Sequence, residues 1–372
     1  MNSNIKAYVI TNPMIAANRS TEVTISKFLR IMKPSFEKVT LIGGNLSVES
    51  DLADIELISF TITRSGNKLK RAMDIIRLQR EMSSIIKKRI KKDDLVFFWI
   101  GDKMFLPYKA VQKTGAEINY FIMGNVAKEG KPTIFSRVSS RLIRYMASHA
   151  DYVCMEGKSV LGEWPGLTPH KTRIIHLYVD QIAMNPLDER DKVIGMVCRL
   201  TAGKHVLECI EAMALIHKDF PEWKLEIIGS GRQYDDCKKR INELNAGEYI
   251  RLLGWVEHDE IANRSKRWKY LLFPSDTEGL PNVVIETMGR GIPVLASNVG
   301  GVKDVIMDGK NGFILSQSTD AAITAGLKKM IHLDKMTYDA ISQCAYNMIK
   351  DQFMRDIAEK NVVSLFGADN YN

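Results

Sequence analysis

Two glutamates stand at a spacing that could hold a ligand with hydroxyl groups at both ends. Glu278 precedes a segment that reads as a helix start, and Glu286 lies eight positions later, inside that helix. The free N–H groups of the helix start, from Gly279 to Val283, can bind an anion between the two acids. A diphosphate with hydroxyl-bearing groups on both sides has this chemistry, so the pattern predicts a nucleotide-sugar site.

The elements that would position these acids form a strand–helix–strand unit. Tyr270–Phe273 is a short apolar run, which is typical of a buried parallel strand. Pro281 is expected to open the helix, because the first helical position does not need a backbone N–H. Ile292–Ala296 reads as the next buried strand, and Gly300–Gly301 as a turn where the backbone approaches a neighbour closely.

The segment EGLPNVVIE, from Glu278 to Glu286, resembles the donor-site signature of family 4 (group 1) of the retaining GT-B glycosyltransferases. This signature, the EX7E motif, is two glutamates separated by seven residues. The resemblance implies that Glu278 orients the donor sugar through its hydroxyls and favours an oxocarbenium-like transition state. It also implies that Glu286 binds the ribose hydroxyls. An ordinary strand–helix–strand unit with two solvated acids is the other interpretation of the same residues.

The resemblance also assigns residues to the diphosphate. Arg199 and Lys204 follow the strand expected at Val193–Val197, and they match the phosphate-binding cations of the family. A departing nucleoside diphosphate gains negative charge, which two fixed cations would stabilise together with the N–H groups of Gly279 and Leu280. No metal ion or other cofactor is expected. The remaining donor-side residues that the resemblance implies are Gly229, Asn282 and Val256.

Two features near these residues allow more than one interpretation. The turn Gly229-Ser230-Gly231 follows a predicted strand, but it lacks the third glycine of a dinucleotide fingerprint. This turn therefore argues against a dehydrogenase. Trp255, next to Val256, fits a core aromatic residue and a platform for the nucleotide base equally well.

The first half of the chain alternates apolar runs with helical segments, which predicts a doubly wound parallel α/β sheet. Ligands of such sheets bind at the carboxyl ends of the strands. Gly101 and Asn125 follow two of the predicted strands and are therefore the expected acceptor-side positions. Each loop by itself fits a plain strand-to-helix turn equally well. Many family members carry a histidine near the second of these positions, whereas this chain has no histidine before His149. Asn125 is the substitute that we consider.

The expected organisation is the GT-B fold, with two Rossmann-like domains facing a central cleft. Residues 1–185 would form the acceptor domain and residues 186–350 the domain that binds the nucleotide sugar. A terminal helix at about 351–372 would pack back on the first domain, as the resemblance implies.

Composition limits the class of protein and its compartment. The chain has 372 residues, with 45% hydrophobic and 26% charged residues, which is typical of globular proteins. No apolar run approaches the roughly 20 residues of a membrane span, and the start of the sequence lacks a signal-peptide pattern. The five cysteines are scattered without metal-site spacing, which predicts reduced thiols in the cytoplasm and no metal centre.

Charge is divided unevenly along the chain. Residues 1–185 contain 28 Lys and Arg against 17 Asp and Glu, whereas the whole chain has a net charge of +8. Ser65–Lys92 and Ser136–Ser148 read as basic amphipathic helices. Such helices fit a solvated surface and an anionic membrane surface equally well. Nucleic acid is not expected as a partner, because aromatic residues do not alternate with the basic ones and no known nucleic-acid-binding module is present.

The predicted function is retaining transfer of a sugar from a UDP- or GDP-sugar to a glycan or lipid-linked acceptor, in the synthesis of a cell-surface polysaccharide or glycoconjugate. The expected location is the cytoplasm, with peripheral binding to the inner face of the membrane. Two alternatives stay open. One is a GT-B sugar-nucleotide epimerase, and the other is a nucleotide-sugar-binding protein without transfer activity, which the missing histidine favours.

Overall fold

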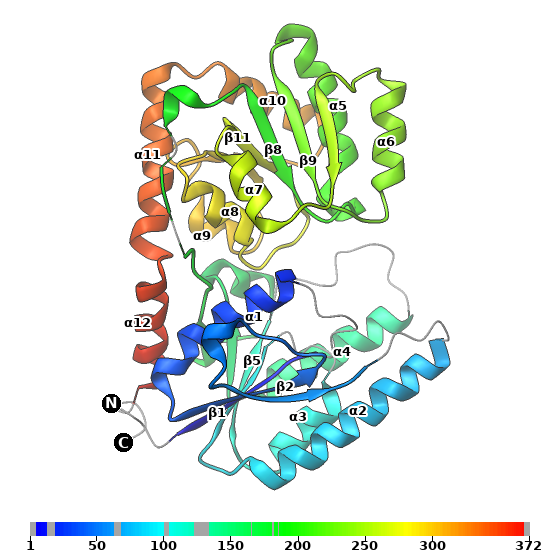
Figure 1. Ribbon diagram of the computed structural model, residues 1–372, viewed down its shortest axis with the longest axis vertical. Coiled ribbons are helices and arrows are strands. Elements are labelled where there is room, and N and C mark those ends of the chain that lie inside the picture. The colour runs from blue at the N-terminus through cyan, green and yellow to red at the C-terminus, as the bar shows by residue number, and fades with distance from the viewer. Residues whose placement is uncertain are drawn as a thin grey trace.

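The chain folds into two parallel-sheet domains that lie one above the other (Figure 1). The computed structural model describes residues 5–12, 19–62, 68–99, 104–122, 134–164, 166–180, 182–184 and 186–367. We call the part built on the first sheet the first domain and the part built on the second sheet the second domain.

The first sheet has seven parallel strands in the order β3-β2-β1-β4-β5-β6-β7. The order reverses between β1 and β4, as in a doubly wound sheet, and ligand sites lie where such a reversal occurs. Buried aromatic residues such as Phe97 and Phe98 fill the two faces of this sheet. Its strands are β1 (Lys6–Ile10), β2 (Lys38–Gly44), β3 (Glu56–Phe60), β4 (Leu95–Phe98), β5 (Glu117–Phe121), β6 (Tyr152–Met155) and β7 (Thr172–Ile174).

The second sheet has six parallel strands in the order β10-β9-β8-β11-β12-β13, which again reverses in its middle. Its apolar runs are buried on both faces, because helices cover each side. Its strands are β8 (Val193–Val197), β9 (Lys224–Ile228), β10 (Ile250–Gly254), β11 (Tyr270–Phe273), β12 (Val294–Ser297) and β13 (Phe313–Leu315).

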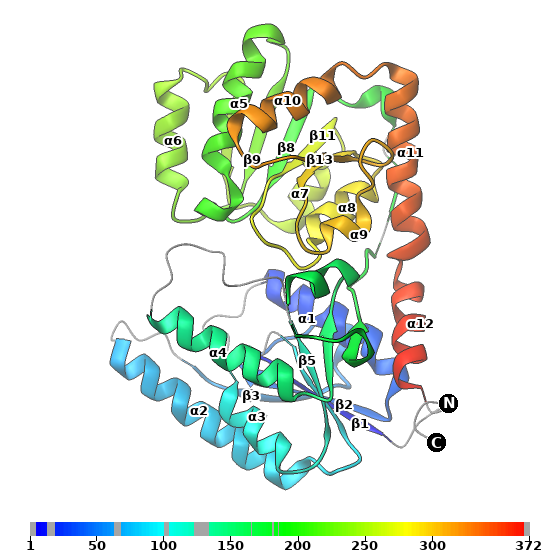
Figure 2. The same ribbon diagram turned by 180° about the vertical axis from the view of Figure 1, so that it is seen from behind.

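Helices flank both sheets, and the last two run along one side of the molecule (Figure 2). α11 lies beside the second domain and α12 beside the first, where Phe366 packs against Phe36 and Phe97. The helices are α1 (Arg19–Met32), α2 (Lys68–Arg89), α3 (Phe105–Gln112), α4 (Ile134–His149), α5 (Val206–Asp219), α6 (Tyr234–Glu243), α7 (His258–Ser265), α8 (Asn282–Met288), α9 (Val302–Val305), α10 (Asp320–Ile331), α11 (Lys335–Gln352) and α12 (Arg355–Phe366).

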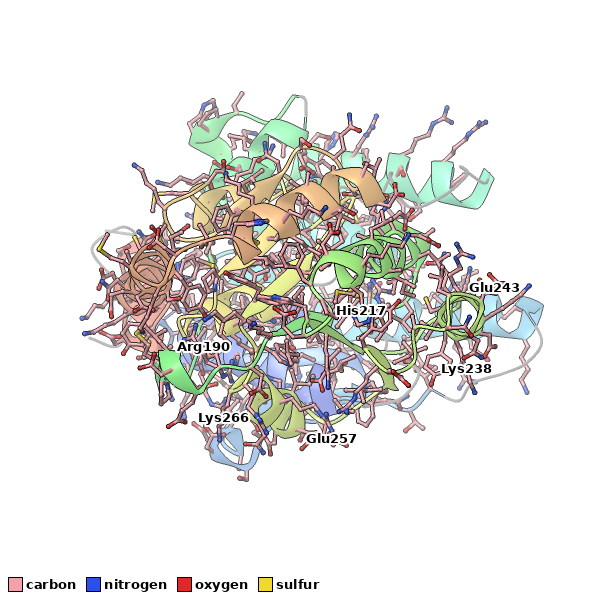
Figure 3. The ribbon with its side chains drawn as sticks, turned by 90° about the horizontal axis from the view of Figure 1, so that it is seen from above. Arg190, His217, Lys238, Glu243, Glu257 and Lys266 are labelled. Atoms are coloured by element: carbon pink, nitrogen blue, oxygen red, sulfur yellow. The ribbon has the colours of Figure 1, made fainter. Side chains whose placement is uncertain are left out.

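The start of the second domain is tied to α11 by a buried arginine. Arg190 donates to the carbonyl oxygen of Gly291 at 2.8 Å and to the hydroxyl of Tyr338 at 2.6 Å. Figure 3 shows Arg190 beside the end of the molecule that α11 occupies. A buried guanidinium is tolerated because its two terminal nitrogens donate to backbone and side-chain oxygens.

The apolar face of α2 is buried along only part of its length. In its second half, Met82 and Ile86 are buried. In its first half, Met73 is 57% exposed and Ile76 is 46% exposed, although both belong to the apolar face that helical spacing defines. The reason is visible in Figure 1, where the N-terminal end of α2 projects beyond the sheet. Periodicity defines an apolar face but does not supply a neighbour to cover it.

Candidate functional site

A cavity of about 660 Å³ lies between the two domains and receives residues from both of them. Helix α1 of the first domain forms one wall. The loop that ends in α7 and the helix α8 form the other walls, so the predicted Glu286, Asn282 and Val256 line one cavity. The other lining residues are Val23, Thr24, Lys27, Val197, Trp255, Glu257, His258, Asp259, Ile261 and Val283.

Lys204 and Glu278 are in direct contact, although 74 positions separate them. The Lys204 ammonium donates to the Glu278 carboxylate and, at 3.0 Å, to the hydroxyl of Ser275. Both charged side chains are nearly buried, with exposed fractions of 12% and 15%. A second link joins the same loops, because the amide of Asp276 donates to the carbonyl oxygen of Gly203 at 3.0 Å. The structure thus brings these two predicted residues together.

Arg199 and Gly229 occupy neighbouring loops at the ends of β8 and β9. Gly229 has a φ of +138°, and a Cβ atom there would lie 1.9 Å from the carbonyl oxygen of Cys198. This close approach explains why a glycine follows the strand. Arg199 is exposed, and no ion pair joins it to another residue in the part of the chain that the structure describes. Its guanidinium is therefore placed in this loop but is not held beside Glu278.

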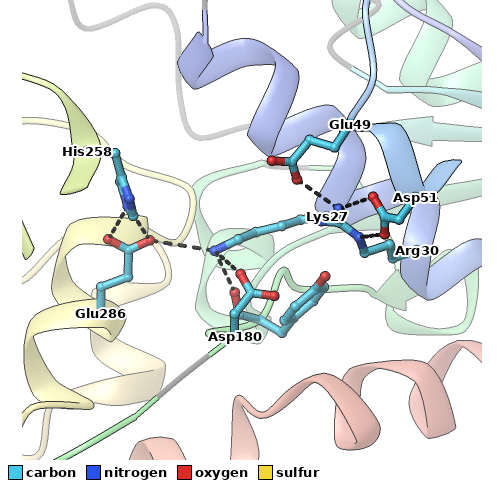
Figure 4. A network of polar contacts seen from close by, with 8 residues as sticks. Lys27, Arg30, Glu49, Asp51, Asp180, His258 and Glu286 are labelled. Atoms are coloured by element: carbon cyan, nitrogen blue, oxygen red, sulfur yellow. Dashed lines mark hydrogen bonds and ion pairs between the residues drawn. The ribbon is translucent and has the colours of Figure 1, made fainter.

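Glu286 is held by two side chains that sequence reasoning missed (Figure 4). Nε2 of His258 lies 3.2 and 3.1 Å from the two carboxylate oxygens, and Nζ of Lys27 lies 3.6 Å from one of them. Lys27 comes from α1, so this contact crosses from the first domain to the second. It also lies 3.3 Å from a carboxylate oxygen of Asp180 and donates to the carbonyl oxygen of Tyr178.

The electrostatics of this cluster favour an ionised Glu286. Burial would raise the pKa of the Glu286 carboxyl, but the hydrogen bond from His258 and the nearby charges of His258 and Lys27 outweigh burial and lower it. The same hydrogen bond raises the pKa of His258. No spacing in the sequence indicated this cluster, because Lys27 lies in the other half of the chain and His258 lies 28 positions before Glu286.

The two interpretations of Trp255 can now be separated. Trp255 is 61% exposed and lines the cavity, whereas Trp268 is the residue of this region that is buried in the core. The core interpretation of Trp255 is therefore wrong. An exposed aromatic ring at a cavity wall is a surface on which a planar ligand can stack.

The loop from Glu278 to Leu280 meets the first domain directly. The amide of Leu280, which was expected to face a diphosphate, donates instead to a carboxylate oxygen of Glu156 at 3.1 Å. The carbonyl oxygen of Gly279 accepts from the amide of Gly301 at 2.6 Å. Glu156 follows β6 and was not predicted, because nothing in its local sequence distinguishes it from a residue of an ordinary turn.

Several expectations remain without a structural counterpart. Gly101 and Asn125, the predicted acceptor-side positions, lie outside the described residues. Within the described ranges, His, Cys, Asp and Glu form no group of three or more that could hold a metal ion. None of the helices in these ranges has the length and apolar character required to cross a membrane.

The arrangement of two parallel-sheet domains around a shared cavity defines the GT-B class of fold, as predicted. Residues 180–348 match the family model described as Glycosyl transferases group 1. The predicted resemblance to group 1 glycosyltransferases is therefore confirmed over this part of the chain, whereas family 4 and a retaining reaction stay predictions.

Relatives and solved structures agree with this classification. The chain is 34% identical over 140 residues to the GtfA subunit of the UDP-N-acetylglucosamine–peptide N-acetylglucosaminyltransferase of Streptococcus gordonii, which covers 36% of this chain and 27% of the relative. It is 28% identical over 210 residues to the N-acetylgalactosamine-N,N'-diacetylbacillosaminyl-diphospho-undecaprenol 4-alpha-N-acetylgalactosaminyltransferase of Campylobacter jejuni, which covers 54% of this chain and 56% of the relative. The chain thus spans less than two thirds of the length of each. The crystal structure of Anabaena HepE in complex with UDP and glucose matches with a TM-score of 0.75 at 16% identity, over 97% of this chain and 99% of that one.

Proposed function

We propose that the chain is a retaining glycosyltransferase that takes its sugar from a nucleoside-diphosphate donor. The observation that carries the proposal is the contact between Lys204 and Glu278, in loops of the domain whose α8 presents Glu286 to the cavity. Residues 186–350 would bind the donor, and residues 1–185 the acceptor. The bond between the sugar and the diphosphate breaks, and an acceptor oxygen forms the new bond on the same face of the sugar.

Each residue has a distinct role in this proposal. Lys204 and Arg199 stabilise the negative charge that builds up on the departing diphosphate. Lys204 is nearly buried and held in place, and a fixed cation interacts strongly with a developing anion. Glu278 orients the sugar and favours an oxocarbenium-like transition state. Glu286 binds the ribose hydroxyls. The leaving phosphate itself can take the proton of the acceptor, so this mechanism does not need a protein base.

We propose a UDP-sugar as the donor. The S. gordonii relative is named for UDP-N-acetylglucosamine, and the HepE structure contains UDP and glucose. Trp255 supports a nucleotide at this cavity, because its exposed ring lies on the same wall as Val256. GDP and GDP-sugars are the natural controls, since the sequence alone does not separate the two bases.

The test is a thermal-shift screen with UDP, GDP and their common sugars, followed by a donor-hydrolysis assay. A ligand that binds only the folded state raises the unfolding temperature, and the rise grows with the logarithm of ligand concentration over Kd. We expect UDP and at least one UDP-sugar to raise it, and GDP to do so less. A shift without release of sugar in the hydrolysis assay would favour a nucleotide-sugar-binding protein. If none of these ligands raises the unfolding temperature, the proposal is contradicted.

We further propose a lipid-linked acceptor or a glycan at a membrane surface. The C. jejuni relative is named for a diphospho-undecaprenol substrate. The projecting end of α2 supports this choice, because exposed Met73 and Ile76 lie beside the exposed cations Arg77 and Arg80. Apolar side chains among cations suit an anionic lipid surface. A soluble acceptor is the alternative if the protein does not bind vesicles.

A further inference from the structure

Three backbone segments approach one another closely where the two domains meet. A Cβ atom on Gly157, after β6 of the first domain, would lie 2.9 Å from Cα of Gly301 and 2.4 Å from a carboxylate oxygen of Asp304. A Cβ atom on Gly300 would lie 1.9 Å from the carbonyl oxygen of Glu278. We call the contact of residues 156–163, 278–280 and 300–304 the glycine junction. Its close approach explains why glycine occupies these positions.

Carboxylates fix the glycine junction from both sides. Glu156 accepts from the amide of Leu280 at 3.1 Å, and Glu163 accepts from the amide of Gly300 at 2.9 Å. In the opposite direction, Asp304 of the second domain accepts from the amide of Ser159 at 2.9 Å and from its hydroxyl at 2.7 Å. Each of these bonds joins one domain to the other. These hydrogen bonds fix the backbone of the glycine junction from both domains.

Glu156 is unusual among these acids because its side chain is buried. Its exposed fraction is only 9%, and burial raises the pKa of its carboxyl to about 7, with the nearby charge of Glu278 acting in the same direction. A buried acid destabilises the folded state compared with an apolar residue that fills the same space. Stability therefore does not account for an acid here, and a role in positioning the neighbouring loop does.

The loop that carries Glu278 is held at three consecutive residues. Lys204 binds the Glu278 side chain, Gly301 donates to the carbonyl oxygen of Gly279, and Glu156 accepts from the Leu280 amide. The first two contacts come from the second domain. Only the third comes from the first domain, and it fixes the peptide two residues after the acid that is proposed to face the sugar.

We propose that Glu156 is a positioning residue, which holds the Glu278 loop in place from the first domain. The sugar end of the donor site is then complete only when the two domains meet at the glycine junction. The three contacts of residues 278–280 support the positioning of the loop. The effect of Glu156 on turnover rests on the proposed function. Glu163 assists by fixing the adjoining loop at Gly300.

The first measurement reads the loop without any substrate. Hydrogen exchange of peptides that contain Leu280 and Gly300 is followed by mass spectrometry in the wild type, Glu156→Ala and Glu156→Gln. We expect exchange at Leu280 to be at least tenfold faster in Glu156→Ala. Glu156→Gln should restore most of the protection, because an amide oxygen can accept the same hydrogen bond. Unchanged exchange in Glu156→Ala would overturn the proposal.

The second measurement separates positioning from nucleotide binding. In hydrolysis of UDP-glucose, Glu156→Ala should lower turnover about tenfold while the Kd for UDP changes less than about twofold. An equal loss in both quantities would overturn positioning in favour of direct nucleotide contact. The control variant is Glu81→Gln. Glu81 is a half-exposed acid of α2 that pairs with Arg77, so its replacement should change neither turnover nor the Kd for UDP.

The two measurements also separate this inference from the proposed function. If the wild type neither binds UDP nor hydrolyses UDP-glucose, the proposed function fails, and hydrogen exchange still tests the positioning of the loop. If Glu156→Ala does not fold, Glu163→Ala, read at the Gly300 peptide, provides the same test of the junction. Unchanged exchange at that peptide would then overturn the proposal.

Discussion

Replacing Glu156 by glutamine should remove a loss of stability that the folded wild type suffers as the pH rises. Burial is the main cause that raises the pKa of Glu156 from 4.5 to about 7. The folded state therefore holds this proton more tightly than the unfolded chain does. The stability that the neutral acid contributes is complete below pH 4.5, and it is lost progressively as the pH rises through 7.

The size of the effect follows from the two pKa values. Each tenfold change in proton affinity is about 1.4 kcal/mol, so a pKa raised from 4.5 to about 7 costs the folded wild type about 3 kcal/mol at pH 8.5. About 2 kcal/mol of this cost develops between pH 5.5 and pH 8.5. Glutamine carries no titrating proton and keeps an acceptor for the Leu280 amide. We therefore expect the free energy of unfolding of Glu156→Gln to rise by about 2 kcal/mol relative to that of the wild type between pH 5.5 and pH 8.5.

Urea unfolding followed by tryptophan fluorescence measures this difference. The free energy of unfolding is determined for both proteins at pH 5.5, 7 and 8.5, and the difference between them is taken at each pH. Other titrating groups affect both proteins and cancel in that difference. Glu81→Gln measures what the loss of a half-exposed negative charge does by itself. A difference between Glu156→Gln and the wild type that does not change with pH would refute the argument.

Three further predictions concern the proposed donor site and the surface of the first domain. Lys204→Ala and Arg199→Ala should each weaken UDP binding by about 1.5–3 kcal/mol, or roughly 10- to 150-fold, because each removes a charge-assisted contact. Calorimetry that gives wild-type affinity for both variants would contradict the phosphate assignment. Glu286→Ala should impair UDP binding, whereas Glu278→Ala should leave UDP binding nearly intact and lower turnover, because its contacts belong to the sugar and the transition state. Loss of nucleotide affinity alone in both variants, or no loss in either, would reject the donor-site interpretation of the motif. The protein should pellet with anionic vesicles but not with neutral ones at low salt, and Met73→Glu should reduce pelleting, since each basic residue near anionic lipid gains about 1 kcal/mol and an added acid opposes this attraction. Equal pelleting with both vesicles, or none, would favour a soluble acceptor.

Much of the second domain could be predicted because its signals are local. The strands at Tyr270–Phe273 and Val193–Val197 have the predicted bounds, since short apolar runs between turn residues have few other interpretations. The resemblance placed Lys204 and Glu278 in one donor site, but it did not predict that the two side chains touch. No spacing rule joins two charged residues in separate loops, and the fold of the sheet is what brings the ends of β8 and β11 together.

The contacts between domains could not be predicted. Glu156 meets Leu280 across 124 positions, and Lys27 reaches Glu286 from the opposite half of the chain. The local sequence around each of these acids and cations resembles an ordinary turn or surface helix. The exposure of Met73 and Ile76 has a related reason, since helical periodicity places both on an apolar face but does not supply a neighbour that covers it. Burial depends on where whole elements are placed, which local patterns do not contain.

The two contacts between the domains have different physical characters, and each suits its end of the proposed donor. Lys27 has two acceptors besides Glu286, the Asp180 carboxylate and the Tyr178 carbonyl oxygen, so ribose hydroxyls can take its place without leaving a buried, unpaired cation. The glycine junction has no comparable freedom, because its backbones touch at Gly157 and Gly300. In the proposed binding mode, the ribose end of the cavity can therefore exchange partners, while the sugar end is fixed before a ligand arrives. Fixed groups stabilise developing charge most effectively when they do not have to reorganise during the reaction, so rigidity is more useful beside the breaking bond than beside the ribose.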